Sequence, residues 1–181
     1  MRYRRVQLAG GSFFFTLVTH QRIPLFADRE GVQLWHHAVA KVQGWMPFEV
    51  EAQVVMLDHV HMLWSLPEGD SDYPTRIRLL KSAFTRTWVR TRAVPTRSAS
   101  RIDKREQMVW QRRYWEHTIR DDADFQAHLD YIHINPVRHG LAAVARDWPH
   151  SMFHEWQELG VYEPWWGSAE MPPLSAWVGR E

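Results

Sequence analysis

The sequence predicts an α+β fold in which an antiparallel sheet carries helices packed on one face. Two observations lead to this expectation. Apolar runs of strand length alternate with amphipathic helical patterns, in the order strand, helix, strand, strand, helix, strand, helix. The chain also has 181 residues and a hydrophobic fraction of 45%, which fits one domain with a core of its own.

The first three elements follow one another directly. Residues 12–19 are predicted to form a buried strand, because an almost continuous apolar run follows the Gly10-Gly11 turn. Residues 30–44 carry apolar side chains at helical spacing, and the pattern ends at Gly44. Residues 48–57 alternate apolar and polar side chains as a half-buried strand does.

The next strand candidate covers residues 59–66 and ends at the turn residues 67–70, Pro-Glu-Gly-Asp. Residues 74–92 have a helical apolar stripe bordered by Lys81 and several arginines, Arg76, Arg78, Arg86, Arg90 and Arg92. Residues 93–107 contain proline, serine and several charges, which is typical of an exposed loop.

The last two elements are a strand candidate over residues 108–119 and a helix. Asp121 or Asp122 is expected to cap this helix, which should run to about Asn135 and end before Pro136. The first six elements follow the β-α-β-β-α-β order of the ferredoxin-like plan.

We expect one domain over residues 1–153. Residues 154–181 then form an irregular C-terminal extension that packs on it, because residues 147–181 are rich in tryptophan and proline and poor in basic side chains.

Composition excludes several classes of protein. The chain has no cysteine, so it has no disulfide scaffold, no cysteine zinc site and no thiol nucleophile. The apolar run at residues 13–18 is far too short to span a bilayer, and no cleavage site of small residues follows it. The sequence therefore predicts neither a membrane segment nor a signal peptide.

Charge is unevenly distributed along the chain, although the formal net charge is only +1. Residues 71–120 carry 13 Lys and Arg against 4 Asp and Glu, while the rest of the chain carries 9 against 17. A concentrated arginine field indicates a surface for a polyanion. A solvated helix face encoded by a GC-rich genome, which favours arginine codons, explains the same count equally well.

The His59-Val60-His61 triplet lies on a predicted strand, where side chains two residues apart share one face. The two imidazoles can therefore converge on one divalent cation. With eleven histidines in the chain, however, such a triplet on its own is weak evidence for a metal site, and two ordinary strand histidines explain it as well.

Tyr131 and Asn135 lie one turn apart on the last predicted helix. An amide oxygen there can act as a third metal ligand while a phenolate attacks a phosphorus atom polarised by the metal. A tyrosine beside an apolar stripe is more often a packing residue. For Asp124, His128 and His133 on the same helix we expect a solvated face without a functional role.

Together these stretches form a family signature. His59-Val60-His61 with the following Pro67-Glu68-Gly69-Asp70, Tyr114 to His117, and the block from Asp130 to Gly140 resemble the HUH single-strand endonucleases. The chain is most similar to the REP-associated tyrosine transposases, which are relatives of insertion-sequence transposases with one catalytic tyrosine. The resemblance runs from about Tyr3 to Phe153.

The resemblance implies a ferredoxin-like or RRM-like sheet and a specific chemistry. Tyr131 would attack a DNA phosphodiester and form a 5′-phosphotyrosine link, with His59, His61 and Asn135 as ligands of Mg²⁺ or Mn²⁺. The substrate would be a single-stranded DNA hairpin of the REP type, and strand transfer would need no ATP. The protein would be a bacterial, cytoplasmic, nucleoid-associated monomer.

The candidate DNA contacts are basic and aromatic residues near the start of the chain and in the arginine-rich segment: Tyr3, Arg4, Arg5, Arg78, Lys81, Arg86, Arg112 and Arg113. Two departures from the family pattern stand out. Leu57 replaces a usual proline, and Met152 replaces the second serine of a Trp-Pro-x-Ser-Ser motif, so Ser151 is assigned no role.

Two other functions compete with this one. A hairpin-binding module that has lost cleavage would share the basic segment, but all four candidate site residues are present. A metal-dependent hydrolase of small molecules would use the two histidines, but it would not need a basic segment of net charge +9.

Overall fold

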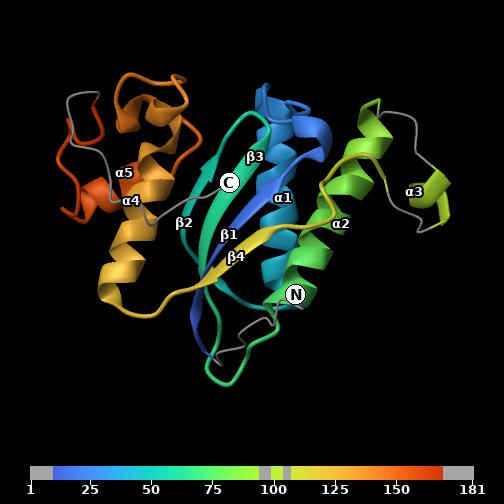
Figure 1. Cartoon of the computed structure of the whole chain (residues 1–181), viewed down its shortest axis with the longest axis horizontal. Coiled ribbons are helices and arrows are strands. Elements are labelled where there is room, and N and C mark those ends of the chain that lie inside the picture. The colour runs from blue at the N-terminus through green and yellow to red at the C-terminus, as the bar shows by residue number, and fades with distance from the viewer. Residues whose placement is uncertain (1–9, 94–98, 104–106, 169–181) are drawn as a thin grey trace.

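Four strands form one antiparallel sheet at the centre of the molecule (Figure 1). The structure is a computed structural model that describes residues 10–93, 99–103 and 107–168. The strands are β1 Ser12–Val18, β2 Glu49–Val55, β3 His59–Ser65 and β4 Trp115–Thr118, in the spatial order β2-β3-β1-β4. This antiparallel α+β arrangement confirms the predicted fold class.

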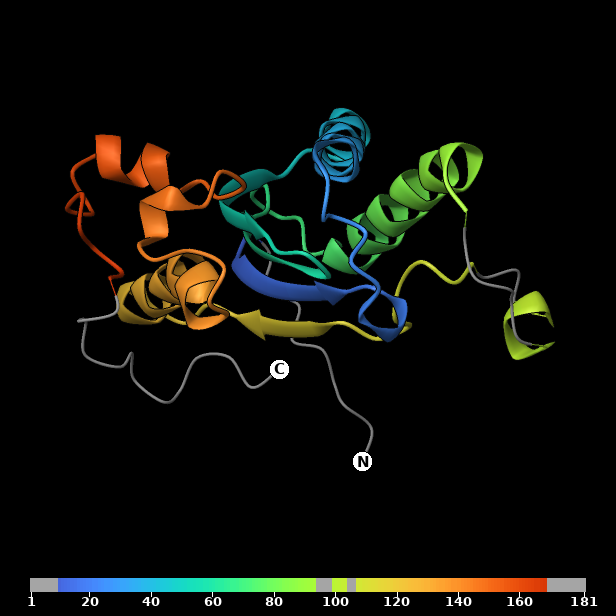
Figure 2. The same ribbon diagram turned by 90° about the horizontal axis from the view of Figure 1, so that it is seen from above.

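The α-helices in the described residues are α1 Arg29–Trp45, α2 Tyr73–Thr91, α3 Ala99–Asp103, α4 Asp122–Arg138 and α5 Phe153–Glu158, with short 3-10 turns η1 His20–Arg22 and η2 Ala145–Asp147. Helices α1 and α2 lie side by side on one face of the sheet, as predicted (Figure 2). Helix α4 packs on β2 and β3 from the opposite face. None of the helices in these residues is long and apolar enough to cross a membrane.

The sheet separates two apolar cores, because successive side chains of a strand point to opposite faces. Phe13 and Phe15 of β1 and Trp64 of β3 belong to the core under α1 and α2. Phe14 of β1 and Leu63 of β3 point the other way and pack against α4. The β1–β3 register pairs Phe14 with Leu63 and Thr16 with His61. The histidine pair of β3 therefore faces α4.

Helix α2 begins with a capped turn and a buried arginine. The Asp72 side chain accepts a hydrogen bond from the Thr75 amide at 3.1 Å. Arg76 is only 1% exposed and donates to Asp70 Oδ2 at 2.6 Å and to the carbonyl oxygen of Pro47 at 2.7 Å. Arg76 is therefore a structural residue that ties the β3–α2 turn to the end of α1, and it is not part of the predicted basic surface.

Two predicted boundaries are wrong, and the segment predicted to be a loop, residues 93–107, contains the short helix α3. Strand β4 starts only at Trp115, because Val109 and Trp110 turn into the core under α1 and α2 instead of alternating. Helix α4 begins after the Asp121 cap as predicted, but it continues through Pro136 to Arg138. Pro136 lies in the last turn, so the backbone hydrogen bond that it removes affects only the end of the helix.

The described part of the C-terminal extension lies against α4 and β2. Trp156 Nε1 donates to the carbonyl oxygen of Glu51 at 2.8 Å, and the Tyr162 hydroxyl donates to Asp130 Oδ1 at 2.7 Å. Phe153 is fully buried in the core under α4. The division of the chain into residues 1–153 and 154–181 stays a prediction.

Candidate functional site

The histidine pair lies at the start of the central strand β3 and is buried. His59 is 1% exposed and His61 is 0% exposed, and their ring centroids are 4.8 Å apart. Strand β3 pairs with β1 along its whole length and with β2 along most of it, so both imidazoles stand on a backbone hydrogen-bonded on both sides. Their common side faces α4, as the spacing predicts.

Each imidazole is held through its Nδ1 atom by a neighbouring side chain. His59 Nδ1 donates to Asp58 Oδ1 at 2.5 Å, and His61 Nδ1 lies 2.9 Å from Thr16 Oγ1. Partners of this kind orient metal-binding histidines in proteins and select their tautomer. Nε2 is consequently the nitrogen of each ring that a metal ion would use.

Tyr131 and Asn135 approach the histidine pair from α4. The Tyr131 ring stands edge-on to the His61 ring with centroids 5.1 Å apart, and Phe14 lies beneath both rings. Asn135, one turn later, is 1% exposed. Among the residues that the structure describes, its Oδ1 atom has no hydrogen-bond partner. A buried amide oxygen without a partner is costly, and a cation would satisfy it.

The predicted residues His59, His61, Tyr131 and Asn135 thus belong to two elements that face each other, β3 and α4. We call these four residues the His/Tyr site. Two imidazole nitrogens and an amide oxygen form a donor set suited to a divalent metal ion. The donor set and the buried amide oxygen therefore fit the expected metal.

Two cationic or titratable side chains that the sequence did not single out lie beside this site. The Arg138 guanidinium lies 5.5 Å from the centroid of the Tyr131 ring, and the His139 ring is 5.4 Å from the His59 ring. Both side chains are exposed. The spacing of residues 131, 135 and 138 places Arg138 on the same helix stripe as the tyrosine and the asparagine, which is the signal that could have identified it.

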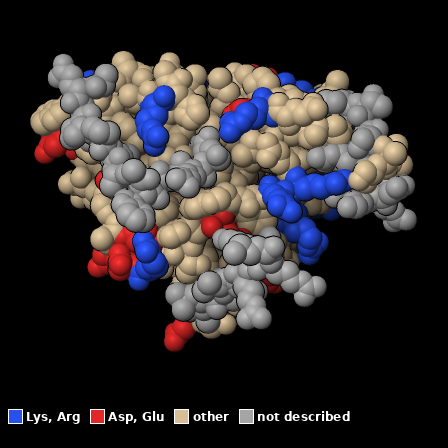
Figure 3. All heavy atoms as spheres, in the orientation of Figure 1, with Lys and Arg blue, Asp and Glu red and all other residues tan. Residues whose placement is uncertain are grey.

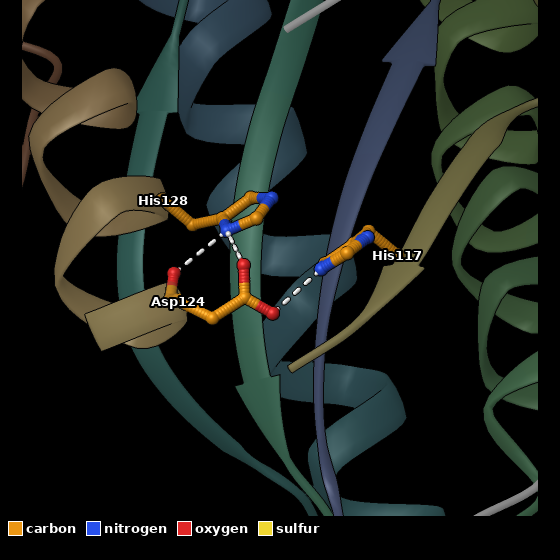
Figure 4. Close-up of side chains that lie close together, drawn as sticks. All are labelled: His117, Asp124 and His128. Carbon is orange, nitrogen blue, oxygen red and sulfur yellow. Dashed lines mark hydrogen bonds and ion pairs between the residues drawn. The ribbon is translucent and has the colours of Figure 1, made fainter. Parts of the chain in front are cut away.

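A second group of polar side chains joins β4 to the first turns of α4 (Figure 4). Asp124 Oδ2 accepts from His117 Nε2 at 2.8 Å and from Arg120 Nε at 2.9 Å, and the His128 Nδ1 atom lies 2.8 Å from the Asp124 carbonyl oxygen. We call these four residues the Asp124 cluster. Asp124 and His128 are buried, so the expectation of a solvated face is wrong for both.

Electrostatics explain why this buried carboxylate stays charged. Burial alone would raise the pKa of Asp124, but the hydrogen bonds from Arg120 and His117 outweigh it and hold this pKa well below its usual range. The ligand atoms of His117, Asp124 and His128 lie within 4.8 Å of one another, close enough to hold a metal ion. Because Arg120 already occupies the carboxylate, we interpret the cluster as the support that fixes α4 on β4.

His133 is also buried rather than solvated, which corrects the third expectation for this helix. Its Nδ1 atom lies 3.0 Å from Ser151 Oγ, and burial lowers the pKa of His133 to about 3. Ser151 Oγ also accepts from the Phe153 amide at 3.2 Å. Both residues therefore join α4 to the start of α5.

The candidate DNA contacts are only partly described. Tyr3, Arg4 and Arg5 lie outside the described residues. Figure 3 shows Lys and Arg side chains gathered over α2 and the segment that leads into β4. In this region the exposed basic residues from the predicted set are Arg78, Arg86, Arg112 and Arg113.

Lys81 differs from these arginines. Its ammonium group donates to the Gln111 carbonyl oxygen at 2.9 Å and lies 5.4 Å from the centroid of the Tyr114 ring. Burial lowers the pKa of Lys81 to about 8. Lys81 therefore connects α2 to the segment before β4, in addition to any contact with DNA.

Comparison with known proteins identifies the class. The family model described as "Transposase IS200 like" matches residues 11–135. A REP-associated tyrosine transposase of Escherichia coli (strain K12) is 39% identical over 91% of this chain and 89% of its own length. A relative from Haemophilus influenzae is 40% identical over 91% of this chain and 92% of its own length.

A solved structure of a REP-associated tyrosine transposase bound to a REP hairpin is also similar. It has a TM-score of 0.78 and 36% identity, and the match covers 97% of this chain and 96% of that chain. The protein that has this antiparallel sheet, histidine pair and helix-borne tyrosine is therefore a transposase, an enzyme that acts on DNA. The chain belongs to the IS200-like transposase family, within its REP-associated tyrosine transposases.

Proposed function

We propose that this chain is a metal-dependent single-stranded DNA endonuclease and strand-transferase that acts on REP-like hairpins through Tyr131. The observation that carries the proposal is the contact between the Tyr131 and His61 rings, whose centroids are 5.1 Å apart. It brings a phenol nucleophile from α4 next to a histidine pair of β3 within one chain. The relative of known structure was solved with a REP hairpin bound, which supports the same substrate class here.

His59, His61 and Asn135 would hold the metal ion. Transposases of this family are generally metal-dependent. When bound, a divalent ion polarises the phosphorus and stabilises charge on the phosphate oxygens. Both Mg²⁺ and Mn²⁺ suit the chemistry, and two nitrogen ligands favour Mn²⁺.

In the proposed cleavage step the Tyr131 hydroxyl oxygen loses its proton to solvent and attacks the phosphorus. The new bond joins this oxygen to phosphorus, and the bond from phosphorus to the 3′ oxygen breaks. The 3′ oxygen takes up a proton and leaves as a hydroxyl, so the 5′ end of the other fragment stays on Tyr131. The phosphodiester energy is kept in this link, so a second 3′-hydroxyl can rejoin the strand without ATP.

Arg138 supports Tyr131 in this step. The unperturbed pKa of a tyrosine is about 10, so the phenol is a weak nucleophile at neutral pH. A guanidinium at 5.5 Å from the ring favours the phenolate and the negative charge that develops on the phosphate.

We further propose a monomer that acts in the bacterial cytoplasm near the nucleoid. All four residues of the His/Tyr site come from one chain, so a partner copy is not needed to complete it. The exposed arginines of α2 and of the segment before β4 would contact DNA phosphates, together with Tyr3, Arg4 and Arg5. Sedimentation of the free protein tests the monomeric state, because a stable dimer at micromolar concentration would contradict it.

The test of cleavage uses labelled single-stranded hairpins from repeats that flank the gene, mixed with protein and Mn²⁺ and resolved on a denaturing gel. We expect a labelled band at the mass of protein plus DNA. Tyr131→Phe and EDTA should abolish the band, while Tyr114→Phe, a matched change in the segment before β4, should retain it. A salt-sensitive complex on a native gel without any covalent band would instead indicate a hairpin-binding module without cleavage.

A further inference from the structure

A cavity of about 240 Å³ lies beside the His/Tyr site. It is lined by His59 and His139 but by neither His61 nor Tyr131. Since Tyr131 contacts His61, and His61 is followed by His59 and then by His139, the cavity lies beyond the histidine pair as seen from the nucleophile. The site therefore has a compartment on its far side.

The walls of the cavity combine apolar and charged groups. Pro24, Met56, Leu57 and Leu141 offer apolar surface, and Arg22 and His139 offer hydrogen-bond donors. Asp58 also lines the cavity and is paired with Arg22. The volume is below the range of about 300–1,000 Å³ found for drug-sized ligands. Apolar walls with a guanidinium at the edge suit one nucleobase and an adjacent phosphate, because a base has apolar faces and a phosphate pairs with arginine.

Arg22 lies in a strained turn that surrounding hydrogen bonds hold in place. Gln21 and Arg22 both have φ near 53°, although neither is glycine. Residues other than glycine are strained in this left-handed region and persist there where the surroundings hold them. Thr19 Oγ1 donates to the Ile23 carbonyl oxygen at 2.8 Å across the turn, and Arg22 Nη1 donates to Asp58 Oδ2 at 3.3 Å. These hydrogen bonds hold the turn, with Arg22 directed toward Asp58.

In-line attack gives this compartment a role. When Tyr131 attacks the phosphorus, the leaving 3′ oxygen must lie on the opposite side of the phosphorus. The nucleotide that carries this oxygen then extends away from Tyr131, across the histidine pair and toward His139. We propose that the cavity binds the base of the nucleotide that leaves with the 3′-hydroxyl, with Arg22 contacting the preceding phosphate. This inference rests on the proposed function of Tyr131.

The first test fills the cavity and removes the base. Leu141 is 36% exposed, so Leu141→Trp should fold and occupy the space, and Leu159→Trp, at a position 73% exposed, is the matched control. Cleavage of an unmodified strand by the wild type first identifies the bond that is cut. A second strand is then prepared with an abasic site at the nucleotide that leaves with the 3′-hydroxyl. We expect Leu141→Trp alone, or the abasic site alone, to slow covalent adduct formation about tenfold, which is the effect of losing the apolar contacts of one group.

The decisive result is that the two changes do not add. The strand with the abasic site should be cleaved equally slowly by the wild type and by Leu141→Trp, because both changes remove one contact. An abasic site one nucleotide further in the 5′ direction should slow both proteins by the same factor. Independent effects of Leu141→Trp and the abasic site, or normal cleavage by Leu141→Trp, would overturn the inference.

A second measurement does not depend on cleavage. Tyr131→Phe protein is irradiated with a series of hairpin strands that each carry a single 4-thiothymidine, and the crosslinked peptides are identified by mass spectrometry. We expect one position to crosslink to peptides that contain Leu57 or Leu141. A series without such a crosslink overturns the inference, even if the wild type forms its adduct. If a strand crosslinks in this way but the wild type forms no covalent adduct, the proposed cleavage is contradicted while base binding in the cavity is supported.

Discussion

At the scale of single residues, each imidazole of the histidine pair is held by one neighbouring side chain, His59 by Asp58 and His61 by Thr16. Asp58 precedes His59 in the sequence, so the sequence could have suggested it. Thr16 is 45 residues away from His61, and only the strand register of β1 and β3 places it there. The side chains that hold these imidazoles are therefore predictable when they are adjacent in the sequence, and they cannot be predicted when they come from another strand.

Removing either neighbour should weaken metal binding. We expect Asp58→Asn and Thr16→Val to lower Mn²⁺ affinity about 10- to 100-fold, because the imidazoles lose their fixed tautomer and orientation. Electron paramagnetic resonance titration of free Mn²⁺ measures this loss. Thr87→Val, a change on α2 away from the site, is the control. Unchanged affinity in both site variants would show that the rings are oriented by packing alone.

His133 makes acid stability a second residue-scale prediction. The pKa of His133 is about 3 in the folded chain because of burial, against 6.5 for an ordinary histidine. Between these pH values the unfolded chain binds a proton that the folded chain does not. The free energy of unfolding should therefore fall as pH drops below about 6.5, with a slope approaching about 1.4 kcal/mol per pH unit.

Urea unfolding at a series of pH values measures this slope. His133→Gln should reduce the slope by up to that amount. The same change at the exposed His154 is the control and should leave the slope as it is. A wild-type slope that His133→Gln does not alter would place the acid sensitivity elsewhere in the chain.

At the scale of elements, helix α2 shows how charge counts along the sequence overstate a basic surface. Arg76 is buried against Asp70 and three backbone carbonyls, and Arg92 is paired with Asp28, the N-cap of α1, and with Glu30 in its first turn. Both arginines contribute to the local excess of positive charge but are neutralised within the protein. Their partners are distant in sequence or lie in turns, so a local count cannot identify them.

Arg76→Met should therefore destabilise the fold rather than weaken DNA binding. We expect a loss of roughly 3 kcal/mol in the free energy of unfolding, because Asp70 and the carbonyl oxygens of Met46 and Pro47 lose their donor. Arg90→Met, an exposed change on the same helix, should cost far less. Thermal or chemical unfolding of the two variants measures the difference, and equal costs would contradict the structural role.

At the scale of the whole molecule, the sequence predicted the four strands, the helices α1, α2 and α4, the strand that carries the histidines and the helix that carries Tyr131 and Asn135, but not the short helices α3 and α5. It did not predict that α4 lies on the face opposite α1 and α2, or that Asp124, His128 and His133 are buried. Polar residues become buried where another element supplies hydrogen-bond partners, as His117 of β4 does for Asp124. Such partners arise only from tertiary packing.

Binding of a single-stranded hairpin should depend steeply on salt if the exposed arginines contact phosphates. With about five phosphates neutralised, log K should fall with log salt at a slope near −3.5. Arg78→Gln, Arg86→Gln, Arg112→Gln and Arg113→Gln should each reduce the slope by about 0.7. Lys81→Met should reduce it less, because Gln111 holds the ammonium group. Fluorescence anisotropy at several salt concentrations measures the slopes, and a slope near zero would exclude the basic surface.

The pairing of β3 has a further consequence for how the two halves of the site move. The backbone amides of His59 and His61 belong to a strand held on both sides, so their hydrogen exchange should be among the slowest in the chain. In the described residues, helix α4 contacts the sheet through side chains, and the Asp124 cluster fixes its first turns on β4. The strand that carries the two histidines should therefore be the more slowly exchanging half of the site, and α4 the faster one.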